Sequence, residues 1–340
     1  MNSVRKPVAL AVLAVAGVLL AAACGGGETA TSGITELSGL RGKTIGVTSL
    51  VDTFTLEARY LLQEAEGLRA SPAEGDVTLV EAPAESLPSL LLDREIDAAL
   101  MRERDAFLLL NDDRFRILSH VTEEVRELTD TAVISSVLIS YPDVAEQKRE
   151  ALVEAIRLFS ESGIYFKTNQ GDVIDTIAEA EETDPEFLTW WWDRHDLLLG
   201  DLSEDVQGQL LSLWNAAVAV GDIETSPELS AVLFSQEDEA DEGPLANGDR
   251  TTVSIALLDH PGRRAALYAI EQGILTSDTV DLDITYLPQS ALAEAAAAGL
   301  YDVIETSPLA VALGAERNLE LIILSGALQD QDGTLLFVRN

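Results

Sequence analysis

Short polar side chains follow several apolar, β-branched runs of this sequence, and they are the residues best suited to hold a small molecule. Hydroxyl and acidic groups follow the first run, and an arginine follows a later one. Near the C-terminus the pattern returns with an Asp-His pair, a second arginine and more hydroxyls. Such groups bind ligands through hydrogen bonds and ion pairs, without covalent chemistry. The candidate ligand-binding residues are Ser49, Asp52, Thr53, Arg102, Asp259, His260, Arg263, Ser290, Thr306, Ser307 and Ser325.

Each candidate also has a purely structural interpretation. Thr306-Ser307-Pro308 is typical of a helix cap with proline in the first turn, and Thr53 could be a cap in the same way. The Asp-His-Pro sequence at 259–261 fits a turn whose aspartate accepts backbone N–H groups. Either arginine could simply pair with nearby carboxylates, the more common role in so acidic a chain. Arg102 is the stronger ligand candidate because it directly follows a run of buried character.

The sequence lacks familiar catalytic and metal-binding patterns. Its three histidines, His120, His195 and His260, are widely separated. No H-E-x-x-H, G-x-S-x-G or G-x-x-x-x-G-K-[ST] pattern occurs. We therefore predict a protein that is not an enzyme and needs no metal and no cofactor.

The elements that must position the candidates are strands alternating with helices. Alternation of this kind predicts parallel sheets with crossover helices, in which ligands bind at the carboxyl ends of the strands. The sequence therefore predicts an α/β fold with two doubly wound sheets joined by a hinge. The expected strands are 43–48, 76–80, 96–101, 115–121, 253–258, 282–287, 301–304 and 319–324, and the expected helices are 53–66, 85–94, 262–274, 291–299 and 309–317.

The middle of the chain is helical and ends in an acidic linker. Helical spacing covers 145–166, 172–192 and 204–220, and Asp184 before Pro185 predicts a capped helix start. Trp190-Trp191-Trp192 is interpreted as buried, the alternative being contact with the other lobe or with a partner protein. We divide the chain into a signal peptide (1–23), a lipidated tether (24–36), a second-lobe α/β unit (37–130), a hinge return and helical segment (131–234), an acidic linker (235–250) and a first-lobe α/β unit (251–340).

The N-terminus carries the marks of export. Arg5 and Lys6 precede an apolar run over 8–23, which is shorter than the ~20 residues a membrane-spanning helix needs. Residues 21–25, AAACG, resemble the bacterial lipobox, whose cysteine is diacylated and becomes the mature N-terminus, although alanine replaces the usual leucine at position 21. The alternative is an ordinary secretory signal with an incidental cysteine. We predict a lipid anchor at Cys24, on the extracytoplasmic face of the cytoplasmic membrane.

The charge and cysteine content restrict the partners of the protein. Acidic residues number 59 against 22 basic ones, so the formal net charge is −37. A surface of this charge repels DNA, RNA and anionic lipid headgroups, and we expect no nucleic-acid partner. Cys24 is the only cysteine, which excludes a disulfide within one molecule.

A family resemblance appears at residues 37–47, LSGLRGKTIGV. This segment resembles the phrase that opens the second lobe in nitrate/sulfonate/taurine-type and thiamine-precursor (pyrimidine) binding proteins of ABC transporters. The strand at 76–80, the Ile96-Asp97-Ala98 turn and the helices around 190–192 follow in the family's order, so the likeness covers nearly all of the mature chain. It implies a bilobal, periplasmic-binding-protein-like fold. It also implies a monomer with a small-molecule ligand and an ABC permease and ATPase complex as partners.

The order of the segments departs from that family. A segment resembling 251–339 normally comes first and leads directly into the phrase at 37–47, whereas here it comes last. The simplest interpretation is a circular permutation, with the acidic linker at the former chain ends. Termini that lie close in space make such a rearrangement tolerable. The alternative is a truncated tandem pair of receptors. Permutation is favoured because the two pieces together supply one complete set of elements.

The sequence as a whole predicts an extracytoplasmic solute-binding lipoprotein that delivers a small organic ligand to an ABC importer. Arg102, with nearby hydroxyls and helix N-termini, favours a ligand bearing one anionic group. Asp52 and Asp259 support the alternative of a cationic or amine-bearing ligand. A sensor receptor that signals without transport would share every feature. A pyrimidine-synthase-like enzyme using His260 is disfavoured by the export signal.

Substituting Cys24→Ala tests the anchor. The variant should lack diacylation and be either released or held only through an uncleaved signal, because alanine offers no thiol. Membrane partitioning and the mass of the N-terminal peptide are the measurements. A wild-type N-terminus without lipid, together with unchanged partitioning of the variant, would contradict the prediction.

Overall fold

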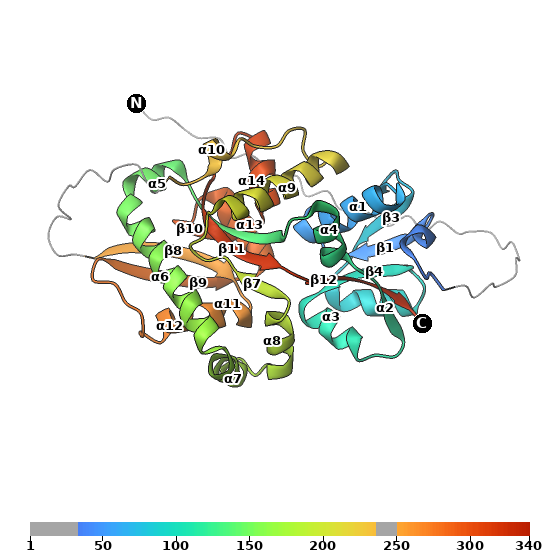
Figure 1. The fold of residues 1–340 in the computed structure, drawn as a ribbon, viewed down its shortest axis with the longest axis horizontal. Helices are drawn as coiled ribbons and strands as arrows, with labels where there is room; N and C mark the ends of the chain where they lie inside the picture. Colours follow the sequence, from blue (N-terminus) through green and yellow to red (C-terminus); the bar gives the residue numbers. More distant parts are fainter. Residues whose placement is uncertain (1–32, 236–249) are drawn as a thin grey trace, which may run out of the picture. The chain divides into compact units, whose positions relative to one another are not determined.

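The computed structural model describes residues 33–235 and 250–340. Cys24, the signal peptide and nearly all of the acidic linker lie outside the described residues. Two six-stranded sheets, here named A and B, form the cores of two lobes, lobe A and lobe B (Figure 1). The α/β fold with two doubly wound sheets is therefore confirmed.

Sheet A is parallel except for one strand. Its neighbours β3, β1 and β4 run parallel, and β12 pairs antiparallel with both β4 and β5. In spatial order the strands are β2 (Ala70–Ser71), β3 (Val77–Glu81), β1 (Thr44–Val47), β4 (Ala98–Arg102), β12 (Thr334–Arg339) and β5 (Phe115–His120).

Sheet B repeats this arrangement. Its neighbours β9, β8 and β10 run parallel, β6 is antiparallel to β10 and β11, and β7 adds an antiparallel edge. In spatial order the strands are β7 (His195–Leu197), β11 (Ile322–Asp330), β6 (Val133–Ser140), β10 (Val303–Thr306), β8 (Thr251–Leu258) and β9 (Val280–Leu287).

The antiparallel strand of each sheet reaches it directly from the other lobe. After α4 (Val121–Thr129) in lobe A, the chain enters sheet B as β6, and after β11 in lobe B it enters sheet A as β12. Figure 1 shows β11 leading into β12 across the molecule. Two short segments, 130–132 and 331–333, therefore join the lobes. A pair of such connections permits hinge motion between lobes.

The position of β12 divides the range 251–340, which the sequence suggested as one first-lobe unit. The strands up to β11 lie in sheet B, whereas β12 lies in sheet A between β4 and β5. The physical reason is burial on both faces: Leu336 and Val338 pack against one helical layer, and Leu335 and Phe337 against the other. Sequence periodicity cannot assign such a strand to one of two sheets.

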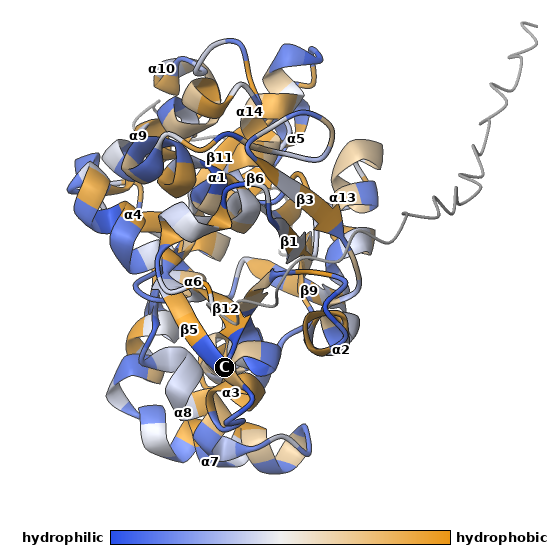
Figure 2. Ribbon diagram, turned by 90° about the vertical axis from the view of Figure 1, so that its right-hand side faces the viewer, coloured by the Kyte–Doolittle hydropathy of each residue, from blue (hydrophilic) through white to orange (hydrophobic). Residues whose placement is uncertain are grey.

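Helices cover both faces of sheet A. Alternate residues of β4 show this, since Ala98 and Leu100 face the cluster of α1 and α4, whereas Ala99 and Met101 face that of α2 and α3. The strands are accordingly largely hydrophobic, as Figure 2 shows. The helical elements of lobe A are η1 (Leu37–Leu40), α1 (Thr53–Glu66), η2 (Ala84–Ser86), α2 (Leu87–Leu92), α3 (Glu103–Leu110) and α4.

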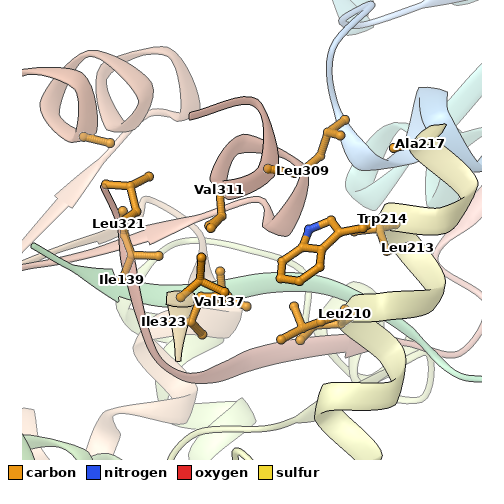
Figure 3. Packing of buried hydrophobic residues seen from close by; sticks show 14 of the residues in the cluster. Val137, Ile139, Leu210, Leu213, Trp214, Ala217, Leu309, Val311, Leu321 and Ile323 are labelled. Carbon is orange, nitrogen blue, oxygen red and sulfur yellow. The ribbon is translucent and has the colours of Figure 1, made fainter. Parts of the chain in front are cut away.

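Sheet B is covered in the same way. Trp214 of α9 enters the cluster beside Val137 and Leu309 (Figure 3), and its indole N–H donates to the Pro308 carbonyl at 3.0 Å. The helices of lobe B are α5 (Pro142–Gln147), α6 (Arg149–Thr168), α7 (Gln170–Ala180), α8 (Pro185–Trp192), α9 (Glu204–Val220), α10 (Leu229–Val232), α11 (Pro261–Ala266), α12 (Tyr268–Glu271), α13 (Gln289–Ala298) and α14 (Pro308–Glu316).

The helix expected over 172–192 is two helices, α7 and α8. Asp184 caps α8 by accepting a hydrogen bond from the Glu186 N–H at 2.9 Å, which confirms the predicted start. Trp191 and Trp192 are buried as expected. Trp190 lies against Phe107 of lobe A, with ring centroids 5.5 Å apart, so part of the tryptophan run also contacts the other lobe.

Helix α9 of lobe B also contacts lobe A, along α1. Arg59 forms an ion pair with Asp222 and donates to the Val220 carbonyl at 3.1 Å. Gln63 donates to the Ala219 carbonyl at 3.1 Å. The C-terminal end of α9 thus contacts lobe A, in addition to the two chain crossings.

Candidate functional site

A cavity of about 430 Å³ lies between the lobes. Residues after β1, β3 and β4 line it from lobe A, and residues after β8, β9 and β10 line it from lobe B. Both sheets therefore present the carboxyl ends of their parallel strands to the same space, the usual place for ligands in doubly wound sheets. The walls combine apolar side chains such as Leu100, Leu258 and Leu292 with hydroxyl and charged groups.

Most of the residues singled out in the sequence lie at this cavity. Those that line it are Asp52, Thr53, Arg102, Asp259, His260, Arg263, Thr306 and Ser307.

Three others do not line the cavity. Ser49 accepts a hydrogen bond from the Val51 N–H at 3.3 Å, Ser325 is buried and donates to the Gly326 carbonyl at 2.7 Å, and Ser290 is exposed in the first turn of α13. Their hydroxyls serve the local backbone or solvent. Ligand contact by any of the candidates remains a prediction.

Several lining residues were not among the candidates: Phe54, Glu103, Asp105, Glu305, Ser135 and Ser136. Glu103 and Glu305 directly adjoin Arg102 and Thr306 in the sequence, so they could have been considered. Ser135 and Ser136 lie in β6, the strand that arrives from the other lobe. No sequence signal indicated that this strand would face the cavity.

Asp52 acts as the N-cap of α1. Its Oδ1 accepts from the Thr55 N–H at 2.7 Å, and its Oδ2 lies 3.4 Å from the Thr48 hydroxyl. Burial raises the pKa of Asp52 above its ordinary value, although the bond from Thr55 and the charge of Arg102 oppose this. The carboxyl group is therefore largely committed to the helix.

The guanidinium of Arg102 is already paired. Nη2 lies 3.3 Å from Oδ2 of Asp330 and Nη1 lies 3.6 Å from Oε1 of Glu103. Its central carbon lies 3.0 Å from the centroid of the Phe54 ring, a cation–π arrangement. The structural interpretation of this arginine thus has direct geometric support.

Glu103 and His260 form a contact between the lobes. Nε2 of His260 lies 2.9 Å from Oε2 of Glu103, while its Nδ1 accepts from the Gly262 N–H at 3.0 Å. Because a ring nitrogen that accepts carries no proton, the contact with Glu103 is a hydrogen bond donated by Nε2. Burial opposes ionisation of Glu103, but His260 and Arg102 together hold its pKa below the ordinary value. Glu103 also has φ of 54°, an uncommon backbone conformation for a residue with a side chain.

Arg263 and Glu305 form a buried pair on the lobe B side. Nε of Arg263 donates to Oε1 of Glu305 at 2.7 Å, and Oε2 accepts from the Leu258 N–H at 3.1 Å. Burial opposes ionisation of Glu305, but Arg263 holds its pKa below the ordinary value. Nη1 of Arg263 is buried and has no hydrogen-bond partner among the described residues.

A second contact joins the lobes near the cavity. The hydroxyls of Thr53, in the first turn of α1, and Ser307, the N-cap of α14, lie 2.6 Å apart. Ser307 also accepts from the Leu309 N–H at 3.1 Å and so caps α14 as the sequence suggested. Together with Glu103 and His260, this contact holds the lobes against each other.

Beneath Arg102, His195 faces Asp330 where β11 ends. Nδ1 of His195 lies 2.7 Å from the Trp191 carbonyl and must donate to it. Nε2 then faces Oδ1 of Asp330 at 3.2 Å, and both side chains are buried. Neither Nε2 nor Oδ1 has a hydrogen-bond partner among the described residues. A Cβ on Gly333 would come within 2.8 Å of Oδ2 of Asp330, so a larger residue there would have to displace this carboxyl group.

The described residues bring together one group of metal-ligand side chains. One ligand atom each from His120, Glu123 and Asp332 lies within 4.8 Å of the others. Arg126 pairs with Glu123 at 3.9 Å, and Arg194 lies 3.7 Å from Asp332. These cations already balance the carboxylates, so the group is best described as an ion-pair network.

Comparisons with known proteins assign no family. No protein-family model and no curated protein matches the sequence. Among solved structures, prephenate dehydratase from Arthrobacter aurescens is 14% identical over 87% of this chain and 60% of its own, with a TM-score of 0.32. The periplasmic aliphatic sulphonate binding protein of Escherichia coli is 11% identical over 87% and 60%, with a TM-score of 0.31.

A phosphate-binding protein of an ABC transporter from Streptococcus pneumoniae is 10% identical over 88% of both chains, with a TM-score of 0.28. This chain spans only 60% of the length of the first two proteins. Likenesses this weak carry no argument about function. In the described ranges, no helix has the length and apolar character needed to cross a bilayer.

Glu57 of α1 is a buried acid close to the hinge. Its Oε2 accepts from the Thr122 hydroxyl at 2.8 Å, whereas Oε1 has no hydrogen-bond partner among the described residues. Burial, with a smaller contribution from Asp330, raises the pKa of Glu57 well above its ordinary value of 4.5. Ionising this group therefore opposes folding.

Glu57→Gln should make stability less dependent on pH. Because the folded-state pKa is raised, the stabilising contribution of the protonated acid is complete below pH 4.5 and is lost as pH rises through the folded-state pKa. Each unit of the shift corresponds to ~1.4 kcal/mol. Urea unfolding of wild type and variant across this range is the measurement, with the exposed Glu64→Gln on the same helix as control. Parallel pH profiles for wild type and Glu57→Gln would contradict the prediction.

Proposed function

We propose that this chain is a solute receptor that encloses a small molecule between its lobes. The observation that carries the proposal is the cavity itself, since both lobes supply its walls and two chain crossings join them. Its volume falls within the ~300–1,000 Å³ of small-molecule sites. The contacts Thr53–Ser307 and Glu103–His260 are of the kind that would form when the lobes close on a ligand.

The chemistry of the cavity favours binding over catalysis. Both ring nitrogens of His260 are engaged, so this residue has no free lone pair with which to act as a base. The hydroxyls of Thr53 and Ser307 are hydrogen-bonded to each other. These observations support the non-enzymatic role expected from the sequence, in preference to a pyrimidine-synthase-like reaction using His260.

We further propose that the receptor is anchored by lipid at Cys24 and hands its ligand to an ABC permease and ATPase complex. The support is the lipobox-like sequence at the N-terminus together with the resemblance at residues 37–47. A monomer suffices for this role, since one chain supplies both walls of the cavity. A sensor receptor would use the same two-lobed cavity, and a permease or a kinase as the binding partner distinguishes the two roles.

The anionic group suggested for the ligand now has less support. That suggestion depended on Arg102 as the ligand's partner, and this guanidinium is paired with Asp330 and Glu103. A ligand anion would have to compete with two carboxylates for it. The amine-bearing alternative does not meet this obstacle.

Solute binding is tested by exposing the purified protein to the small molecules of a cell extract, then identifying by mass spectrometry what is retained. At least one compound should be enriched, and it should raise the stability of the protein by about 2.7 kcal/mol at a hundredfold excess over Kd. Gln289→Trp places a bulky ring in the cavity wall and should weaken binding of that compound by about tenfold or more, ~1.4 kcal/mol.

The neighbouring exposed Ser290→Trp is the matched control, because Ser290 does not line the cavity. It should leave binding unchanged. Retention of no compound, or equal loss in the two tryptophan variants, would contradict the proposed site.

We also propose that the chain is a circular permutant of the receptor family it resembles. Two junctions support this. At the first, the Asn340 N–H donates to the Arg114 carbonyl at 3.0 Å, and Arg116 donates to the Ile34 carbonyl, so both chain segments contact one strand edge. At the second, Arg149 donates to the Ser235 carbonyl at 2.7 Å, and Lys148 donates to the Thr252 carbonyl at 2.9 Å.

A re-permuted chain tests this proposal. Joining Asn340 to Ser32 and opening the chain between 235 and 250 should give a folded monomer that retains the same extract compound, because these contacts bring each pair of ends near a common segment. Circular dichroism, size-exclusion chromatography and the retention assay are the measurements. A re-permuted chain that is unfolded alone and competent only as a head-to-tail dimer would favour the truncated-tandem alternative.

A further inference from the structure

The cations that line the cavity are already neutralised. Arg263 is paired with Glu305, and Arg102 lies between Asp330 and Glu103. The guanidinium of Arg102 thus has two carboxylate partners. Nη1 of Arg263 and Nε of Arg102 are buried and have no hydrogen-bond partner among the described residues, but the charge of each guanidinium is balanced by a carboxylate.

Three of the helix N-termini at the cavity, those of α1, α11 and α14, are already occupied. Such ends attract anions because their N–H groups lack partners. Here Asp52 accepts from the first turn of α1, and Ser307 accepts from the first turn of α14. The short helix α11 begins with its Gly262 N–H bonded to His260. Helices α3 and α13 also begin at the cavity and have no side-chain cap, but the first turn of α3 carries the acids Glu103 and Asp105. Of these five helix ends, α13 alone has neither a side-chain cap nor an acid in its first turn.

The carboxyl groups of the cavity are in excess. The lining contains five carboxyl and two guanidinium groups, and one of the five, Asp259, pairs with Arg264 at 2.7 Å. Asp105 lines the same wall as Glu103 and has no hydrogen bond or ion pair among the described residues. Burial, with the charges of Glu85 and Glu103, raises the pKa of Asp105 above its ordinary value. A cation placed here would relieve that repulsion.

We infer that the ligand carries a positively charged group, in the simplest case a protonated amine, which lies against Glu103 and Asp105. The inference rests on the proposed solute-binding function and names the class of solute. An amine can donate to carboxylate oxygens that face the cavity, while its carbon skeleton lies against apolar walls such as Leu258 and Leu292. The net charge of −37 also attracts cations to the protein at long range.

The contact between Glu103 and His260 gives the site a link to closure. Because Glu103 belongs to lobe A and His260 to lobe B, an amine bound to Glu103 lies beside a contact that joins the lobes. The same carboxylate thus accepts from the ligand and from the opposite lobe. The Glu103 carboxylate is therefore the acceptor both for the charged group of the ligand and for the contact that joins the lobes.

The test uses matched probes, in which one alkyl or phenylalkyl skeleton is supplied as the amine, the alcohol, the carboxylate and the sulfonate. Thermal stabilisation and calorimetry are measured on wild type, Glu103→Gln, Asp105→Asn and the exposed control Glu150→Gln. The amine series should stabilise wild type more than the other three. Glu103→Gln keeps an oxygen acceptor for His260 but removes the charge. It should weaken amine binding by about tenfold or more and leave alcohol binding unchanged.

Asp105→Asn should weaken amine binding in the same direction, and it provides a second measure if Glu103→Gln fails to fold. Glu150→Gln should bind as wild type does. Preference for the carboxylate or the sulfonate, or equal amine binding in wild type and both cavity variants, overturns the inference and leaves the receptor function intact. Stabilisation by no probe, together with no compound retained from the extract, overturns the receptor function and the inference together.

Discussion

The exchange of one strand between the lobes is the constraint on which the rest of the structure depends. Sheet A is completed by β12, which arrives from lobe B, and sheet B by β6, which arrives from lobe A. Neither lobe can complete its sheet from one continuous stretch of chain. Because each exchanged strand is antiparallel to its neighbours, its entry point lies where the parallel strands end. The exchange therefore brings both sets of strand ends, and the loops that follow them, to one cavity.

Bringing the two sets of loops together buries charged side chains near the cavity, and ion pairs offset the free-energy cost of that burial. Burying an unpaired charge costs several kcal/mol, and both guanidinium groups at the cavity form ion pairs that cross elements. Arg263 with Glu305 links α11 to β10, and Arg102 with Asp330 links β4 to the end of β11 at the hinge. His195 lies behind Asp330 and extends this network. Charge in the cavity and the geometry of the hinge are thus connected through shared carboxylates.

Sequence reasoning located the loops of the site better than the roles of their side chains. Residues that follow strands could be recognised because apolar runs mark the strands, and eight of the eleven candidates do line the cavity. The partners of Arg102 could not be recognised, since Asp330 is 228 positions away in the chain. Helix caps were anticipated at Ser307 and Asp184, because capping depends on residues only two or three positions apart.

What the sequence by itself determined is local and periodic. It specified the alternation of strands and helices, the helix caps and the strongly acidic surface, because these follow from neighbouring residues and from composition. Only the tertiary structure decided that β12 joins sheet A, that Ser135 and Ser136 of β6 face the cavity, and that both arginines are neutralised. The physical reason is that these features depend on contacts between distant segments. A buried strand or a charged side chain has many possible partners in sequence, and three-dimensional packing selects one.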